Sequence, residues 1–222
     1  MQETSPAPTE PQWSGRQGLG PRRIILLVAV GAVLGTLFAL APQMLRHWGL
    51  DPKPLERPWV NAPYITTPMD VVDQMLLAAE VKEGEVLYDL GCGDGRIAVV
   101  AAEKFGCRSK GFDIDPDRIR ESRENARNRG VADRATFEQK DVLTLDLSEA
   151  DVVAFYLLPR YLEKLLPEFQ KLRPGTRIVS HDFTLDDWPA DREIRYTSAE
   201  DNQLHRIFVW VAPITPPPVR TQ

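Results

Sequence analysis

The feature that most constrains this chain is the stretch of residues 85–95, which couples a short apolar run to a glycine-rich turn. Val86-Leu87-Tyr88 is typical of a buried strand, and Asp89 and three glycines at alternate positions follow it. Residues 96–104 then have the composition of a helix packed on a sheet. Because glycine has no Cβ, the backbone can turn sharply there and approach a ligand closely. The stretch therefore predicts a nucleotide-type binding site.

The residues around the glycines exclude two common phosphate-binding motifs. A phosphate loop needs Lys and Ser or Thr after its last glycine, and this chain has Arg96-Ile97. The dinucleotide motif has its third glycine three residues after the second, whereas Gly95 follows Gly93 by two. The acid before the first glycine, Asp89, suits a ligand that carries an ammonium group better than it suits a pyrophosphate.

Further strands are predicted at 108–114, 135–140, 151–157, 176–180, 192–196 and 204–211. Strands alternate with helices over residues 85–180, which predicts a parallel sheet covered on both faces by right-handed crossovers. We expect the last two strands to form an antiparallel edge pair. The predicted fold class is α/β, with a Rossmann-like, mostly parallel sheet of seven strands.

Polar side chains are predicted at the carboxyl ends of five strands, the edge where such sheets bind ligands. These side chains are Asp89, Asp113, Asp141, Tyr156 and His181. Asp113 lies 22 residues after Gly91, where an acid can accept hydrogen bonds from both hydroxyls of a ribose. Asp115-Pro116 has the pattern of a helix cap and first helical residue, so we expect Asp115 to be structural.

Composition excludes several classes of function. The chain of 222 residues is 43% hydrophobic and 27% charged, as in globular proteins, with a net charge of −5. This charge argues against nucleic acid as a partner, because no basic face is implied. Cys92 and Cys107 form no Cys-x-x-Cys pair, and His47, His181 and His205 are too scattered to suggest a metal cluster. No metal site is predicted.

The chain before the glycine turn is predicted to contain a membrane anchor. Residues 24–45 carry no charge, and 22 helical residues are long enough to cross a bilayer of about 30 Å. A cleaved signal peptide ending near Ala39-Leu40-Ala41 is the alternative, although Pro42 at the cut would hinder cleavage. The expected organisation is a disordered tail (1–21), a transmembrane anchor (22–46), a proline-rich linker (47–63), one catalytic domain (64–212) and a proline-rich tail (213–222).

A helix is predicted to begin directly after the linker. Thr67 can cap it, Pro68 suits its first turn and Asp70 complements its dipole. Apolar residues recur at helical spacing from Val71 to Ala79, so one face of this helix is expected to pack on the sheet.

Four motifs carry a resemblance to a known family. They are Pro63-Tyr64-Ile65-Thr66-Thr67-Pro68, the stretch from Tyr88 to Ile97, Tyr156-Leu157-Leu158-Pro159, and Ser180-His181-Asp182-Phe183 with Trp188. Asp-x-Gly-x-Gly-x-Gly resembles the first motif of class I S-adenosylmethionine-dependent methyltransferases. The whole set resembles the membrane-associated lysine methyltransferases that include the ATP synthase c-subunit and adenine nucleotide translocase enzymes. The apolar segment before the domain matches this family too.

The resemblance implies S-adenosylmethionine as cofactor and assigns roles to particular residues. The cofactor-binding candidates are Asp89, Gly91, Gly93, Gly95, Asp113, Asp141, Val142 and Thr66. The catalytic candidates are Tyr156, Pro159 and His181, where Tyr156 and nearby carbonyls would orient a neutral amine. Structural alternatives remain open: a turn-forming Asp141, a packed Tyr156 and a hydrogen-bonded structural His181.

The expected function is protein-lysine N-methylation on a membrane or membrane-near protein. Methylation of a small molecule or a lipid of the quinone type is an alternative, and so is a non-catalytic, membrane-tethered assembly factor. The arginines and lysines around the anchor do not decide its orientation. Because the cofactor is made inside cells, we expect a single-pass membrane protein whose catalytic domain faces the cytoplasm.

Overall fold

The computed structural model describes residues 64–185 and 188–214. The predicted tail, anchor and linker at residues 1–63 lie outside this part of the chain, as do residues 215–222. None of the helices within the described ranges combines the length and the apolarity needed to span a bilayer.

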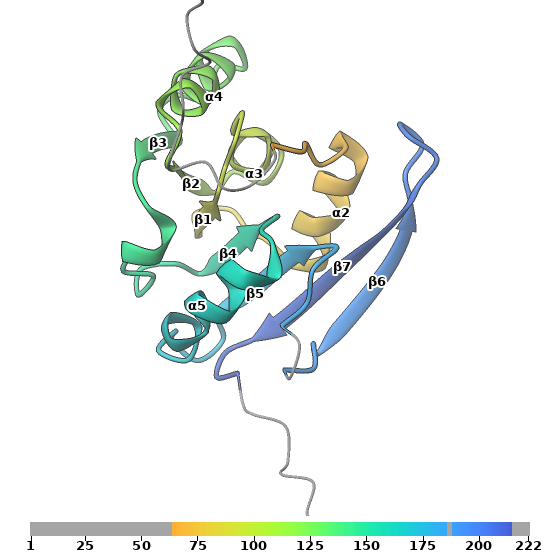
Figure 1. Ribbon diagram of the computed structural model, residues 1–222. Helices are drawn as coiled ribbons and strands as arrows, with labels where there is room; N and C mark the ends of the chain where they lie inside the picture. The colour runs from red at the N-terminus through yellow and green to blue at the C-terminus, as the bar shows by residue number, and fades with distance from the viewer. Residues whose placement is uncertain (1–63, 186–187, 215–222) are drawn as a thin grey trace, which may run out of the picture. The chain divides into compact units, whose positions relative to one another are not determined.

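A seven-stranded sheet forms the centre of the described chain, in the order β3-β2-β1-β4-β5-β7-β6 (Figure 1). Its strands are β1 (Val86–Leu90), β2 (Arg108–Asp113), β3 (Ala135–Gln139), β4 (Val152–Phe155), β5 (Arg177–His181), β6 (Arg192–Thr197) and β7 (Leu204–Val211). Neighbouring strands from β3 to β5 are parallel, whereas β7 is antiparallel to both β5 and β6. The predicted mostly parallel sheet and the final antiparallel pair are confirmed.

Helices cover both faces of the sheet, as Figure 1 shows. They are α2 (Met69–Ala78), α3 (Arg96–Phe105), α4 (Pro116–Asn128) and α5 (Pro159–Phe169), with a short 3₁₀ helix, η1 (Val142–Thr144). Apolar side chains of α2 and α3 share one core cluster with alternate residues of β1, β4 and β7. Those of α5 share a second cluster with the opposite alternate residues. This division follows from the two-residue repeat of a strand, which sends successive side chains to opposite faces.

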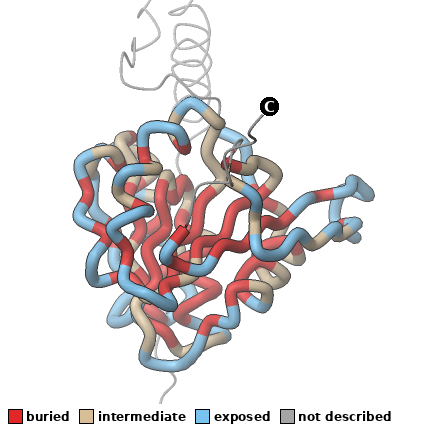
Figure 2. The backbone as a smooth tube through the Cα atoms, turned by 90° about the horizontal axis from the view of Figure 1, so that it is seen from below, coloured by how far each residue is buried: buried red, intermediate tan, exposed pale blue. Residues whose placement is uncertain are grey.

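Burial is most complete in the middle of the sheet (Figure 2). All four residues of β4 are buried, as expected for a central parallel strand with helices on both sides. The edge strand β6 has no fully buried residue. The apolar strands therefore fix the centre of the sheet and hold its carboxyl edge in place.

The antiparallel strand β7 determines which side chains meet beyond the end of β5. Its register pairs His181 at the end of β5 with Ile207. This pairing brings His205, two residues earlier in β7, beside His181, and the rings lie 4.9 Å apart between centroids. The expectation that the histidines are too scattered to cluster is therefore wrong for this pair, because antiparallel pairing joins residues that are 24 positions apart. His47 lies outside the described residues.

Two predicted helix caps have different outcomes. Asp115 caps α4 and accepts a hydrogen bond from the Asp117 N–H, so its structural role is confirmed. The prediction that Thr67 caps α2 is wrong: Pro68 is the N-cap residue and no side chain accepts a bond there. The Thr67 hydroxyl instead lies 3.0 Å from Nδ1 of His181, a buried partner that helix patterns do not reveal.

Candidate active site

A cavity of about 410 Å³ lies at the carboxyl edge of the sheet, where the sequence predicts the ligand site. Most of the predicted site residues line it: Thr66, Asp89, Gly91, Gly93, Asp113, Asp141, Val142 and Tyr156. Gly95, Pro159 and His181 are not among the lining residues. Their predicted roles remain predictions, and the structure gives each of them a different local setting.

Asp89, at the end of β1, is the most unusual charge in the cavity wall. Its side chain is buried, and its Oδ2 is the one buried polar side-chain atom without a hydrogen-bond partner in residues 64–185 and 188–214. Burial, and then the nearby carboxylates of Asp94 and Asp113, raise the pKa of Asp89 to about 8, while a bond from the Ala98 N–H lowers it. An unpaired carboxylate oxygen in such a place favours a ligand that brings an ammonium or another donor.

The glycines bring the backbone close to the cavity. Gly91 and Gly93 have φ angles of +73° and +53°, which glycine adopts without strain. A Cβ at Gly91 would lie 2.7 Å from the Leu157 side chain, and one at Gly93 would lie 2.5 Å from the Tyr64 ring. Both side chains line the cavity, so larger residues at these two glycines would push its walls apart.

Gly95 has a packing role at the start of α3. It is the N-cap residue of that helix, with φ at +79°. A Cβ there would meet the Phe137 ring and the Ser122 side chain, each at 2.6 Å. The third glycine therefore holds α3 close to α4 and β3.

Two acids at the ends of β2 and β3 are held by backbone N–H groups. Asp113 accepts from Gly93 N through Oδ2 and from Asp115 N through Oδ1, both at 2.9 Å. Asp141 accepts from Leu143 N at 3.0 Å and caps η1. A carboxylate has about four acceptor sites, so both acids keep capacity for ribose hydroxyls or an amino group. The turn-forming role considered for Asp141 is present and does not exclude a binding role.

The segment before α2 also lines the cavity, and sequence reasoning did not assign a role to its aromatic residue, Tyr64. Tyr64 lies on the glycine turn, with the Arg118 guanidinium 4.4 Å from its ring centroid. Arg96 joins this segment to the turn, because its Nη1 donates to the Thr67 carbonyl at 2.6 Å and its Nε and Nη2 bind Asp94. The signal for Tyr64 was its place in the motif that begins at Pro63.

A different set of residues lies where β4 and β5 end. The rings of Tyr156 and His181 are 4.1 Å apart between centroids. Burial, followed by the nearby Asp182 carboxylate, raises the Tyr156 pKa. The hydroxyl therefore stays protonated, with Asp182 as the nearby acceptor for its hydrogen. Its oxygen keeps lone pairs for a ligand in the cavity.

Pro159 lies at the start of α5, with Leu158 as the N-cap residue. The first helical position suits proline, since its missing N–H would have no partner there. The Leu158 carbonyl, one of those expected to orient an amine, accepts the Tyr161 N–H at 2.9 Å, and the role predicted for these carbonyls stays a prediction.

The cavity fits S-adenosylmethionine on three observations. The unpaired Asp89 oxygen suits the ammonium of the methionine part, and the glycine turn places backbone in the cavity wall. The acids Asp113 and Asp141 suit the hydroxyls and the base of the nucleoside part. When bound, this cofactor supplies an electrophilic methyl group on a sulfonium.

Comparisons with known proteins agree with this fit. The profile of the family described as ANTKMT methyltransferase domain matches residues 89–192. A protein-lysine N-methyltransferase of Saccharolobus islandicus is 39% identical over 153 residues, which are 68% of this chain and 94% of that protein. The adenine nucleotide translocase lysine N-methyltransferase of Mus musculus is 30% identical over 174 residues, 77% of this chain and 74% of that protein.

A solved structure extends the comparison to the fold. It is the crystal structure of an RNA methyltransferase from Salinibacter ruber in complex with S-adenosyl-L-homocysteine, 44% identical, with a TM-score of 0.63. The match covers 71% of this chain and all of that one. Fold, cavity and comparisons together define a class I S-adenosylmethionine-dependent methyltransferase. Within that class, the chain belongs to the ANTKMT methyltransferase family.

Proposed function

We propose that the protein is a protein-lysine N-methyltransferase. The observation that carries this proposal is the 39% identity to a protein-lysine N-methyltransferase across 94% of that relative. The second relative, 30% identical over 74% of its length, is also named as a lysine N-methyltransferase. Because a shared fold does not fix the substrate, the argument also needs a cavity that suits an amine.

The cavity wall has features that suit a neutral amine. Tyr64, Tyr156, Leu157 and Tyr161 contribute aromatic or apolar surface to it. An apolar wall disfavours a charged group, so it lowers the pKa of a lysine that enters and favours the nucleophilic form. The Tyr156 oxygen accepts an N–H of that amine in this proposal, because Asp182 is the nearby acceptor for its own proton. The protein then mainly aligns the reactants and excludes water.

Membrane attachment is part of the proposal. The uncharged stretch at residues 24–45 would hold the catalytic domain beside a bilayer, with a membrane or membrane-near protein as its substrate. We place the domain on the cytoplasmic side, where the cofactor is made. Protease protection in intact spheroplasts tests this, since digestion of the C-terminal domain from outside would overturn the orientation.

RNA is the second candidate acceptor, favoured by the name of the Salinibacter ruber protein. The net charge of −5 and the sequence pI of about 5.3 count against it, because an RNA backbone requires basic partners. Small molecules and lipids remain a third class of acceptor.

One labelling experiment separates these acceptors. Membranes and cytosol from cells that lack the gene are incubated with the full-length protein and methyl-labelled S-adenosylmethionine, then divided into protein, RNA and organic extract. We expect the label in a protein band, at lysine after hydrolysis. Asp113→Ala is the matched control and should leave that band unlabelled. Label that is dependent on the wild-type protein but found in RNA or in the organic extract would overturn the proposal.

A further inference from the structure

A row of hydrogen bonds leads from the cavity wall to the protein surface. Thr67 lines the cavity, and its Oγ1 lies 3.0 Å from His181 Nδ1. His181 Nε2 lies 2.8 Å from His205 Nδ1. His205 Nε2 lies 3.2 and 3.3 Å from the two carboxylate oxygens of the exposed Asp201. Thr67, His181 and His205 are all buried, so bulk water does not replace these bonds.

The outer end of the row fixes the direction of its first hydrogen bond, the one between His205 and Asp201. Bonds from the Gln203 N–H and from His205 lower the pKa of Asp201, so it is ionised at neutral pH and can only accept. His205 Nε2 must therefore carry a proton and donate it. The proposed row has His205 as a neutral imidazole, in which the other nitrogen is an acceptor, so His205 Nδ1 accepts from His181. An imidazolium at this position would instead donate to His181 Nε2 and reverse the row.

The same reasoning continues inward to the cavity. Burial lowers the pKa of His181 to about 4, although Asp182 opposes this, so His181 is neutral and has one N–H. That N–H is on Nε2, which leaves Nδ1 as an acceptor. The only group on the Thr67 side that can donate is the hydroxyl, which gives its single proton to His181. Thr67 Oγ1 then has lone pairs alone for the cavity.

We propose that His205 and Asp201 are positioning residues that hold the Thr67 hydroxyl as a hydrogen-bond acceptor for the amine to be methylated. That an amine occupies this place rests on the proposed lysine function. The direction matters chemically, because a neutral amine attacks through its only lone pair and its N–H groups need acceptors. A hydroxyl that donated instead would bind this lone pair and oppose attack.

Strand order places Thr67 at the end of the cavity that suits the acceptor. Its partner His181 ends β5, and Tyr156 follows β4, whereas Asp113 and Asp141 lie at the ends of β2 and β3. The nucleoside acids and the Thr67 hydroxyl thus occupy opposite ends of the carboxyl edge. Two acceptors, Thr67 Oγ1 and the Tyr156 oxygen, are available at the second end.

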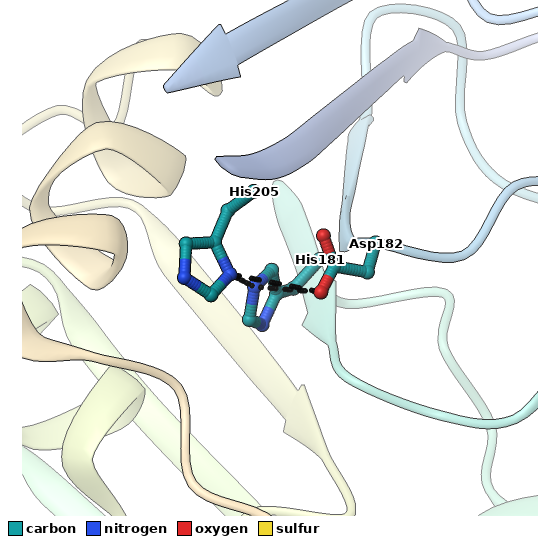
Figure 3. A group of neighbouring side chains, drawn as sticks. All are labelled: His181, Asp182 and His205. Carbon is teal, nitrogen blue, oxygen red and sulfur yellow. Dashed lines mark hydrogen bonds and ion pairs between the residues drawn. The ribbon is translucent and has the colours of Figure 1, made fainter. Parts of the chain in front are cut away.

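Asp182 provides the main competing arrangement. Figure 3 shows its carboxylate beside the two imidazoles, and Oδ2 lies 3.3 Å from His181 Nε2 and 3.6 Å from His205 Nδ1. In a tetrahedral zinc site with metal–ligand bonds of about 2.0 Å, two ligand atoms lie about 3.3 Å apart. The separations observed here are close to that value. A cation there would need a lone pair on His181 Nε2, which moves the His181 proton to Nδ1 and reverses the bond to Thr67. The two arrangements therefore differ in the His181 tautomer.

Nitrogen NMR of the full-length protein in detergent, labelled with ¹⁵N-histidine, tests the proposal directly. The chain has three histidines, so the spectrum is simple. At pH 7.5 we expect His181 and His205 both as neutral Nε2–H tautomers. A proton on His181 Nδ1 would overturn the proposal, and so would stoichiometric divalent metal in the same sample. This readout needs no methyl acceptor, so it stands apart from any failure of the lysine function.

Variants test whether the direction matters for turnover. His205→Gln keeps an acceptor for His181 and a donor for Asp201, so kcat should stay within about threefold of wild type. His205→Ala removes both and should lower kcat about tenfold. Asp201→Lys offers a donor to His205 Nε2 and reverses the row, with a similar expected loss. In all three, the Kd for S-adenosylhomocysteine should stay within about twofold.

The matched control for the charge reversal is Glu124→Lys, an exposed position on α4, which should match wild type. If Asp201→Lys reverses the His181 tautomer yet keeps full turnover, Thr67 is not a positioned acceptor and the proposal fails. If His205→Gln lowers kcat as much as His205→Ala does, the direction of the hydrogen bonds does not matter for turnover and the proposal is likewise refuted. A wild-type protein that methylates no lysine would instead refute the proposed function.

Discussion

The two ends of the active-site cavity are built in different ways. At the predicted nucleoside end, Asp113 and Asp141 each accept the N–H of the residue two positions ahead, and Asp113 also accepts the Gly93 N–H from the turn after the neighbouring strand β1. At the other end, Thr67 bonds to a histidine 114 positions away, and that histidine bonds to a residue from β7. The first end depends on local turns, and the second depends on the complete sheet. Cofactor binding and turnover should therefore respond separately to substitution.

The largest effect is expected from Asp113→Ala. This change removes the predicted acceptor for two ribose hydroxyls and the acceptor for the Gly93 and Asp115 N–H groups. The Kd for S-adenosylhomocysteine, measured by calorimetry, should rise about 100-fold, because hydrogen bonds to a charged group contribute about 1.5–3 kcal/mol each. Far-UV circular dichroism should match wild type. A Kd within about threefold of wild type would show that the nucleoside end is assigned wrongly.

Tyr156→Phe tests the opposite end. It removes one acceptor oxygen and keeps the ring against His181. We expect kcat to fall about 10- to 100-fold, with the cofactor Kd unchanged, because a polar group left without its partner costs about 1–3 kcal/mol. Steady-state kinetics and calorimetry on the same preparation give both numbers. Equal turnover in the variant would remove Tyr156 from the catalytic candidates.

Gly93→Ala tests whether the packing of Tyr64 on the glycine turn shapes the cofactor site. The new methyl group would meet the Tyr64 ring at 2.5 Å. Gly130→Ala is the matched control, because Gly130 has a similar φ of +68° and open space around it. Both variants should lose about 1 kcal/mol of stability from backbone strain. Only Gly93→Ala should weaken cofactor binding, by about tenfold. If both bind alike, Tyr64 does not shape the cofactor site.

The smallest expected effect is the number of protons that Asp89 releases when the cofactor binds. Its pKa is raised above the unfolded value to about 8, so the free protein holds this carboxyl protonated at pH 7. A cationic ligand favours the ionised form, so binding at pH 7 should release up to about one proton, and binding at pH 9 almost none. Calorimetry in buffers of different ionisation enthalpy measures this. If Asp89→Asn releases as many protons on cofactor binding as wild type does, the proton comes from another group.

The same shift bears on stability. A carboxyl whose folded pKa exceeds its unfolded pKa of about 3.9 binds its proton more tightly when folded. The contribution of Asp89 to the free energy of unfolding of the cofactor-free protein should therefore fall as pH rises from about 4 to 8. The buried neutral His181, whose pKa is lowered to about 4, contributes an opposite slope below about pH 6.5 in wild type and in Asp89→Asn alike. The difference in unfolding free energy between Asp89→Asn and wild type should therefore grow in favour of the variant from about pH 4 to 8, and a difference that is independent of pH would contradict this account.

Sequence reasoning predicted that Asp113 and Asp141 lie at one edge of the sheet, and the cavity lining confirms this placement, because the signals are local. Strand, glycine turn and strand-end acid follow one another in the chain, and backbone geometry fixes their meaning. It did not find His205, because antiparallel pairing of β7 with β5 decides what lies beside His181. It also assigned Thr67 to helix capping, since helix rules consider only near neighbours. The long-range partner His181 is preferred over the cap in the folded protein.

Methyl-lysine mapping by mass spectrometry tests the central claim most directly. Membrane and soluble proteins are compared from cells that lack the gene and cells complemented with wild type or with Asp89→Asn. We predict a methylated lysine peptide that is present with wild type and absent from the other two. A lysine methylome identical in all three, with a methylated nucleoside or lipid that depends on the wild-type gene, would contradict the account.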